Sequence, residues 1–192
     1  MSIIDEDYKP LTFHKNARDF IWIGGHGAIA KGLDLVIDAF KLLKTDSKLH
    51  IFGSLTNEPN FYNVYKDLFD NDKSILFHGM ADVNSDGFKE IVQHCAFTVF
   101  PGSAEAGASS VLTTMHLGLL PIVTLGSSID LVDFGVFVDK LDVKSTQIAM
   151  EKALDFDEDK ILEQRKAVIN HIKKNHSAKS FKNTFEAAFD KI

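Results

Sequence analysis

The sequence has 192 residues, of which 45% are hydrophobic and 25% are charged. This length and composition fit one globular domain with a sizeable core, and they exclude a disordered or fibrous chain. Since 21 Lys and Arg residues face 27 Asp and Glu residues, the net charge of −6 argues against a nucleic-acid-binding protein. The single cysteine, Cys95, excludes an internal disulfide framework and a cysteine-based zinc site.

The first residues do not have the pattern of a signal peptide, because acidic side chains stand where a signal carries basic ones. No run of the sequence approaches the ~18 apolar residues of a membrane helix. We therefore expect a cytoplasmic protein. Residues 1–18 are polar and irregular, which predicts a leader or linker, and residues 19–192 are expected to form the domain.

From Asp19 onward, short apolar runs alternate with longer amphipathic segments. The short runs predict strands at 20–23, 49–52, 75–78, 97–100, 121–124 and 135–138. The longer segments predict helices at 32–44, 61–69, 86–94, 110–117, roughly 145–155, 158–174 and 178–190. This alternation predicts the α/β class, with a parallel sheet of about six strands covered on both faces. Such sheets bind ligands at the carboxyl ends of their strands.

The segment 24–32, Gly-Gly-His-Gly-Ala-Ile-Ala-Lys-Gly, follows the first predicted strand. Its glycines allow backbone amides to approach an anion, and the next helix adds a partial positive charge. Lys31 is placed to reach a phosphate, and His26 to contact a phosphate or a sugar. The residues 25–30 also match the dinucleotide fingerprint, although no acid follows the second strand to hold a ribose. A tight turn without a ligand stays open as an alternative.

The segment 101–112 follows the fourth predicted strand and contains a carboxylate before small residues and a helix start. Its Glu105 can accept hydrogen bonds from sugar hydroxyls, or it can cap the helix that follows. The amides of residues 107–110 would face an anion. Among the eight histidines, no pair has the four-residue spacing of a zinc-binding helix, so we expect no metal site.

At this point the sequence resembles a known family. Residues 20–26 and 31–40 look like the opening of the donor-binding domain of group 1 (GT4-like) glycosyltransferases. The runs 49–53, 75–79 and 97–124 resemble later parts of that domain, in the same order and spacing. The resemblance implies the C-terminal domain of a GT-B fold, a Rossmann-like three-layer α/β/α arrangement. The N-terminal acceptor domain would then be absent from this chain.

The resemblance also assigns roles to residues of the candidate segments. Lys31 would contact the donor diphosphate, and Glu105 would meet the transferred sugar. His26 or Gly25 stands where the family usually has an arginine, and Thr113 where it has a second glutamate. The remaining positions implied to line the donor site are Gly27, Gly53, Gly79, Met80, Gly107, Ala108, Ser109 and Ser110.

The resemblance implies retaining, metal-independent transfer of a sugar from a nucleotide-sugar, which is the donor substrate, with no further cofactor. The acceptor, a polysaccharide or glycoconjugate precursor, would bind through the missing N-terminal domain, which would also make any peripheral membrane contact. We expect the isolated chain to be inactive in transfer. One alternative is a non-catalytic nucleotide- or sugar-binding module of the same fold, which the substitutions at His26 and Thr113 favour. Another is a nicotinamide-dependent oxidoreductase, suggested only by the spacing of Gly25 and Gly27.

Overall fold

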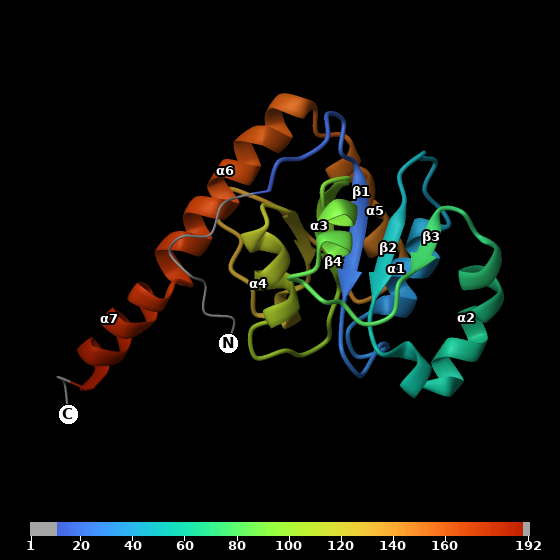
Figure 1. The fold of residues 1–192 in the computed structure, drawn as a ribbon, viewed down its shortest axis with the longest axis horizontal. Helices are drawn as coiled ribbons and strands as arrows, with labels where there is room; N and C mark the ends of the chain where they lie inside the picture. The colour runs from blue at the N-terminus through green and yellow to red at the C-terminus, as the bar shows by residue number, and fades with distance from the viewer. Residues whose placement is uncertain (1–10, 190–192) are drawn as a thin grey trace.

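The computed structural model describes residues 11–189, which form a six-stranded parallel sheet with helices on both faces (Figure 1). The strands lie in the order β3-β2-β1-β4-β5-β6. Their bounds are β1 Asp19–Ile23, β2 Leu49–Phe52, β3 Ile75–Phe77, β4 Cys95–Phe100, β5 Leu120–Val123 and β6 Val136–Phe137. The predicted α/β class, the parallel sheet and the Rossmann-like layering are therefore confirmed.

Helices α1 and α5 pack together on one face of the sheet, while α3 and α4 cover the other (Figure 1). The helix α6 packs beside α4, and α7 continues from it away from the sheet. The bounds are α1 Leu33–Phe40, α2 Pro59–Asn71, α3 Asp86–Val92, α4 Ser109–His116, α5 Val143–Leu154, α6 Glu158–Asn175 and α7 Ala178–Phe189. None of the helices between residues 11 and 189 has the length and apolar character needed to span a bilayer.

The centre of the sheet is buried on both faces. Three successive residues of β1, Phe20, Ile21 and Trp22, are fully buried, which explains the continuous apolar run in place of an alternating one. Across to β4, the ring of Phe20 lies 5.1 Å from that of Phe97, and Trp22 stacks on Phe100. The strand order reverses direction between β1 and β4, so their carboxyl ends flank the topological switch point.

The predicted boundaries differ from the observed ones where turn chemistry intervenes. The predicted helix 32–44 ends at Phe40, because the amides of Leu42 and Leu43 bond three residues back and tighten the chain into a turn. The predicted helix 61–69 begins earlier, at Pro59, since proline suits the first helical position. The strand predicted at 97–100 begins at Cys95, which pairs with β1 across a register shift. Residue 190 of the last predicted helix lies outside the described residues.

Residues 1–10 of the predicted leader also lie outside the described residues, and the boundary at residue 18 stays a prediction. The part from residue 11 packs on the domain. The Arg165 guanidinium carbon lies 3.3 Å from the centre of the Phe13 ring, and Arg165 donates a hydrogen bond to the Cys95 carbonyl at 2.9 Å. Arg18 donates to two carbonyls at the end of α5. Both arginines therefore lie at the amino edge of the sheet, opposite the switch point.

Candidate functional site

The loops after β1 and β4 meet at the switch point. A Cβ atom on Gly32 would lie 2.3 Å from the Pro101 carbonyl oxygen, so only glycine permits this approach. Gly32 also has φ of 70°, in the left-handed region that favours glycine. The Ser103 amide and hydroxyl both donate to the Ala30 carbonyl, at 2.9 Å and 3.1 Å. The backbones of the two loops are thereby fixed against each other.

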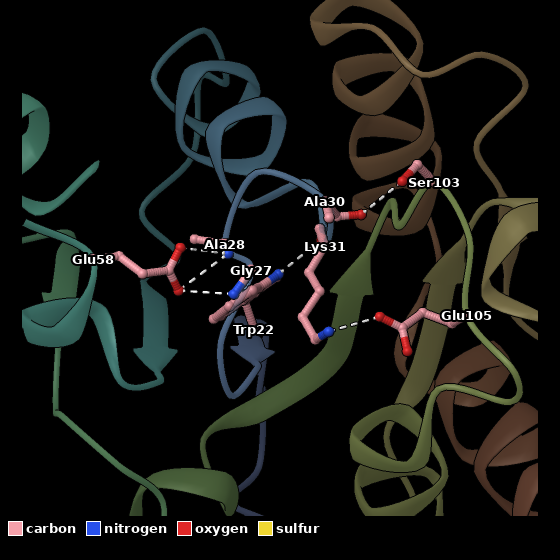
Figure 2. Close-up of polar contacts among 8 residues, drawn as sticks. All are labelled: Trp22, Gly27, Ala28, Ala30, Lys31, Glu58, Ser103 and Glu105. Carbon is pink, nitrogen blue, oxygen red and sulfur yellow. Dashed lines mark hydrogen bonds and ion pairs between the residues drawn. The ribbon is translucent and has the colours of Figure 1, made fainter. Parts of the chain in front are cut away.

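Lys31 and Glu105, one from each loop, form an ion pair. The Lys31 Nζ atom lies 2.7 Å from Glu105 Oε1, and the two side chains are 23% and 24% exposed (Figure 2). The indole of Trp22 donates to the Lys31 carbonyl at 3.2 Å, which holds the lysine backbone on the end of β1. The structure thus brings together the two residues predicted to be catalytic, although 74 positions separate them in the sequence.

The backbone of Glu105 is held by the loop after β5. Its amide donates to the Gly126 carbonyl at 2.7 Å, and its carbonyl accepts from the Ser128 hydroxyl at 2.6 Å. Ser128 has φ of 55°, an uncommon conformation for a residue with a side chain. Sequence reasoning missed Ser128, because its contribution depends on the pairing of β4 with β5. Among residues 11–189, the Glu105 carboxylate bonds to Lys31 and to no amide of α4, so Glu105 does not cap that helix.

The first turn of α4 follows Glu105 in the sequence, and no side chain of residues 11–189 caps its amides. Its N-cap residue, Ala108, has no side chain that could accept a hydrogen bond, and Gly107 before it has φ of 81°. The amides of residues 109–111 therefore have no acceptor within the helix. By contrast, α3, α5 and α6 are capped by the side chains of Ser85, Asp142 and Asp157. The α4 terminus thus has the donors and the partial positive charge that suit an anion.

The other predicted residues occupy the same edge of the sheet with less defined contacts. The Gly53 amide donates to the Gly79 carbonyl at 2.8 Å, which joins the ends of β2 and β3. Beyond them, Met80 is 65% exposed. His26 is exposed on the β1–α1 loop, where Gly25 borders open space. The Thr113 hydroxyl, on the second turn of α4, donates to a backbone carbonyl of its own helix at 2.9 Å.

Glu58 is a further residue of this edge that sequence reasoning missed. The predicted anion-facing amides of the glycine-rich loop donate to its carboxylate, from Gly27 at 2.8 Å and from Ala28 at 3.1 Å (Figure 2). Glu58 comes from the short segment between β2 and α2. Hydrophobic periodicity predicts helices and strands, and it gives no sign that a side chain of this segment contacts another loop. A glutamate directly before a helix-starting proline was the only available sign.

The fold and the site define a Rossmann-like α/β domain with paired charges and open amide donors at its switch point. A comparison of the sequence with protein families identifies the family of this domain. The family of group 1 glycosyl transferases matches residues 17–155, and the chain belongs to this family. A search among curated proteins finds no match. Within residues 11–189, no group of three or more His, Cys, Asp or Glu side chains could hold a metal ion.

Solved structures share the fold at low identity. The catalytic domain of starch synthase IV from Arabidopsis thaliana, bound to ADP and acarbose, is 16% identical with a TM-score of 0.71, covering 94% of this chain and 40% of that one. TarM of S. aureus, in a complex that includes UDP, is 15% identical with a TM-score of 0.74, covering 97% and 38%. The C-terminal domain of LpcC, a group 1 family protein from Francisella tularensis, is 16% identical with a TM-score of 0.67, covering 88% and 96%.

These relatives are GT-B glycosyltransferases, and this chain spans less than half of the length of the first two. The match over nearly all of an isolated C-terminal domain agrees with the predicted C-terminal position of this fold.

Proposed function

We propose that this chain is the donor-binding half of a glycosyltransferase that moves a sugar from a nucleotide-sugar to an acceptor. The observation that carries the proposal is the Lys31–Glu105 pair at the switch point. The pair lies close to the first turn of α4, which has no side-chain cap. The chain also belongs to the group 1 family. The ADP and UDP held by starch synthase IV and TarM support a nucleoside diphosphate as the ligand class.

In the proposed reaction, the bond between the anomeric carbon and the diphosphate oxygen breaks, a bond to an acceptor hydroxyl oxygen forms with retention, and the hydroxyl proton passes to the leaving diphosphate or to solvent. The leaving diphosphate gains negative charge, which the Lys31 ammonium and the α4 amides would stabilise. Glu105 would position the sugar or stabilise positive character at its anomeric carbon. These contributions are electrostatic, and none requires a metal ion.

The acceptor would be bound by an N-terminal domain outside this chain, as in a complete GT-B enzyme. That domain would supply the acceptor-binding groups and any peripheral contact with a membrane. We therefore propose that the isolated chain binds a donor and transfers little. A cytoplasmic location and an acceptor of the polysaccharide or glycoconjugate type belong to the same proposal.

A thermal-shift panel of UDP, GDP, ADP, CMP and NADH tests the donor role on the chain alone. A nucleotide at about 100 times its dissociation constant adds about 2.7 kcal/mol, which raises the melting temperature by about 5–11 °C. We expect one nucleoside diphosphate to give this shift, Lys31→Ala to reduce it by about half or more, and Lys44→Ala, an exposed lysine after α1, to leave it intact. A nucleotide shift that is unchanged in Lys31→Ala, or a shift from NADH alone, would refute the assignment.

A second candidate is a non-catalytic nucleotide- or sugar-binding module. It is favoured by Thr113, whose hydroxyl donates to its own helix, and by the position of both arginines at the opposite edge. Turnover of the full-length protein separates the two candidates. An enzyme is expected to lose more than about tenfold in turnover with either Lys31→Ala or Glu105→Ala, as expected when one charge-assisted contact is removed. A non-catalytic binding module would show no sugar transfer even in the natural full-length protein.

A further inference from the structure

Glu58 has an unusual position for the contacts it makes. It is the residue before α2, where a side chain ordinarily caps its own helix, but it makes no such bond there. Its carboxylate instead crosses to the β1–α1 loop and accepts hydrogen bonds from the amides of Gly27 and Ala28, at 2.8 Å and 3.1 Å (Figure 2). The two residues are adjacent; the Gly27 amide donates to Oε1, and the Ala28 amide donates mainly to Oε2 and also to Oε1, at 3.4 Å.

Two consecutive amides around a left-handed residue form a concave anion site of the kind that holds phosphates. Gly27 supplies that conformation, with φ of 84°. We call the amides of Gly27 and Ala28 the loop nest. The nest is connected to the ion pair, because the Gly27 carbonyl accepts a hydrogen bond from the Lys31 amide at 3.0 Å. The loop nest and the lysine therefore belong to one hydrogen-bonded turn.

We propose that Glu58 is a built-in anion that occupies the loop nest and determines where a diphosphate can bind. A phosphate in the nest would need the same two amides and would face the carboxylate at close range. Glu58 therefore excludes it and directs the diphosphate to Lys31 and the first turn of α4. The inference rests on the proposed function only in naming a diphosphate as the ligand; the occupied nest is a property of the protein alone.

Glu58→Ala removes the occupant and leaves both amides available. We expect the variant to bind pyrophosphate at the loop nest and to gain about tenfold or more in affinity, the change that one charge-assisted hydrogen bond gives. Glu58→Gln keeps one acceptor oxygen and removes the charge, so its gain should be smaller. The matched control is Glu90→Gln, which neutralises an exposed carboxylate on α3 and should leave the affinity unchanged.

Amide NMR spectra of the chain, titrated with inorganic pyrophosphate, read the loop nest and α4 separately. In the natural protein, pyrophosphate should leave the Gly27 and Ala28 resonances in place; in Glu58→Ala it should move them. Movement of both resonances in the natural protein, or their failure to move in a folded Glu58→Ala variant, would overturn the proposal. The dispersion of the spectrum reports folding, and Glu58→Gln decides by the same two resonances if the alanine variant does not fold.

Hydrogen exchange provides a test without any ligand. The Gly27 and Ala28 amides should exchange slowly in the natural protein and in Glu90→Gln, and faster in Glu58→Ala, because the carboxylate is their acceptor. Fast exchange in the natural protein would contradict the occupied nest. The proposed donor function fails by a different result, since it requires pyrophosphate to move the resonances of residues 109–111 in the natural protein.

Discussion

The Lys31–Glu105 ion pair predicts opposite effects on anion binding from substitutions at its two members. An incoming phosphate must compete with the Glu105 carboxylate for the Lys31 ammonium, because the two groups are already in contact at 2.7 Å. Lys31→Met removes the cation and should weaken binding. Glu105→Gln removes the competitor and should strengthen it. Inorganic pyrophosphate is the suitable probe, since it carries no sugar for Glu105 to contact.

The magnitudes follow from the exposure of the pair. A charge-assisted contact to phosphate contributes about 1.5–3 kcal/mol, so Lys31→Met should weaken binding by about 10- to 150-fold. The ion pair itself is about a quarter exposed and partly screened by solvent, so its net contribution is about 1 kcal/mol. Its loss in Glu105→Gln should therefore tighten pyrophosphate binding by about fivefold.

Isothermal titration calorimetry at low ionic strength measures both effects. Lys44→Met and Glu90→Gln are the matched controls, because they remove the same charges from exposed positions away from the switch point. If Glu105→Gln weakens pyrophosphate binding, the carboxylate is not a competitor and the reasoning is wrong. If Lys31→Met leaves the affinity unchanged, the lysine is not an anion ligand.

Three further predictions concern stability, each measured by urea unfolding. Gly32→Ala should lower the free energy of unfolding by about 2–4 kcal/mol, because the new Cβ would lie 2.3 Å from a carbonyl oxygen at a left-handed φ. Gly25→Ala is the control, since open space surrounds Gly25, and it should lower this free energy by less than about 1 kcal/mol. Arg165→Met should lower the free energy of unfolding by about 1–3 kcal/mol by removing a buried charged donor to the Cys95 carbonyl, and the exposed neighbour Lys166→Met should be nearly neutral. Burial lowers the pKa of His116 from 6.5 to about 4, and His176 adds to this, so the unfolded chain binds the proton more readily. The stability that neutral His116 contributes is therefore fully present above pH 6.5 and is lost as the pH falls from 6.5 to about 4, by about 1–2 kcal/mol with solvent screening, and this loss should be reduced in His116→Gln.

Most of the sheet could be predicted because its strands are buried on both faces. A strand buried on both faces has a short run of apolar residues in the sequence. The run at β2 predicts its observed bounds, Leu49–Phe52. The ends of the elements were harder, since they depend on single turns. The helix predicted at 32–44 ends in the structure at Phe40. Its end is determined by backbone hydrogen bonds, which leave no periodic pattern in the sequence.

The candidate site was predicted in part for the same reason. Lys31 and Glu105 follow the first and fourth strands, and the carboxyl ends of strands are where parallel sheets bind ligands. Their direct contact depends on β1 and β4 being neighbours, which the order of elements along the chain does not determine. Glu58 and Ser128 act across loops from irregular segments, so only their placement in three dimensions reveals their contacts.

The arrangement of charges suggests how donor binding and sugar positioning would be linked under the proposed function. In the structure, Lys31 is paired with Glu105, the loop nest is filled by Glu58, and the first turn of α4 has no side-chain cap for its amides. A diphosphate that takes up those amides and pairs with Lys31 must separate the lysine from the Glu105 carboxylate. The released carboxylate lies on the loop between β4 and α4, whose backbone Gly126 and Ser128 hold in place. The binding of the diphosphate would thus free Glu105 to meet the sugar attached to it.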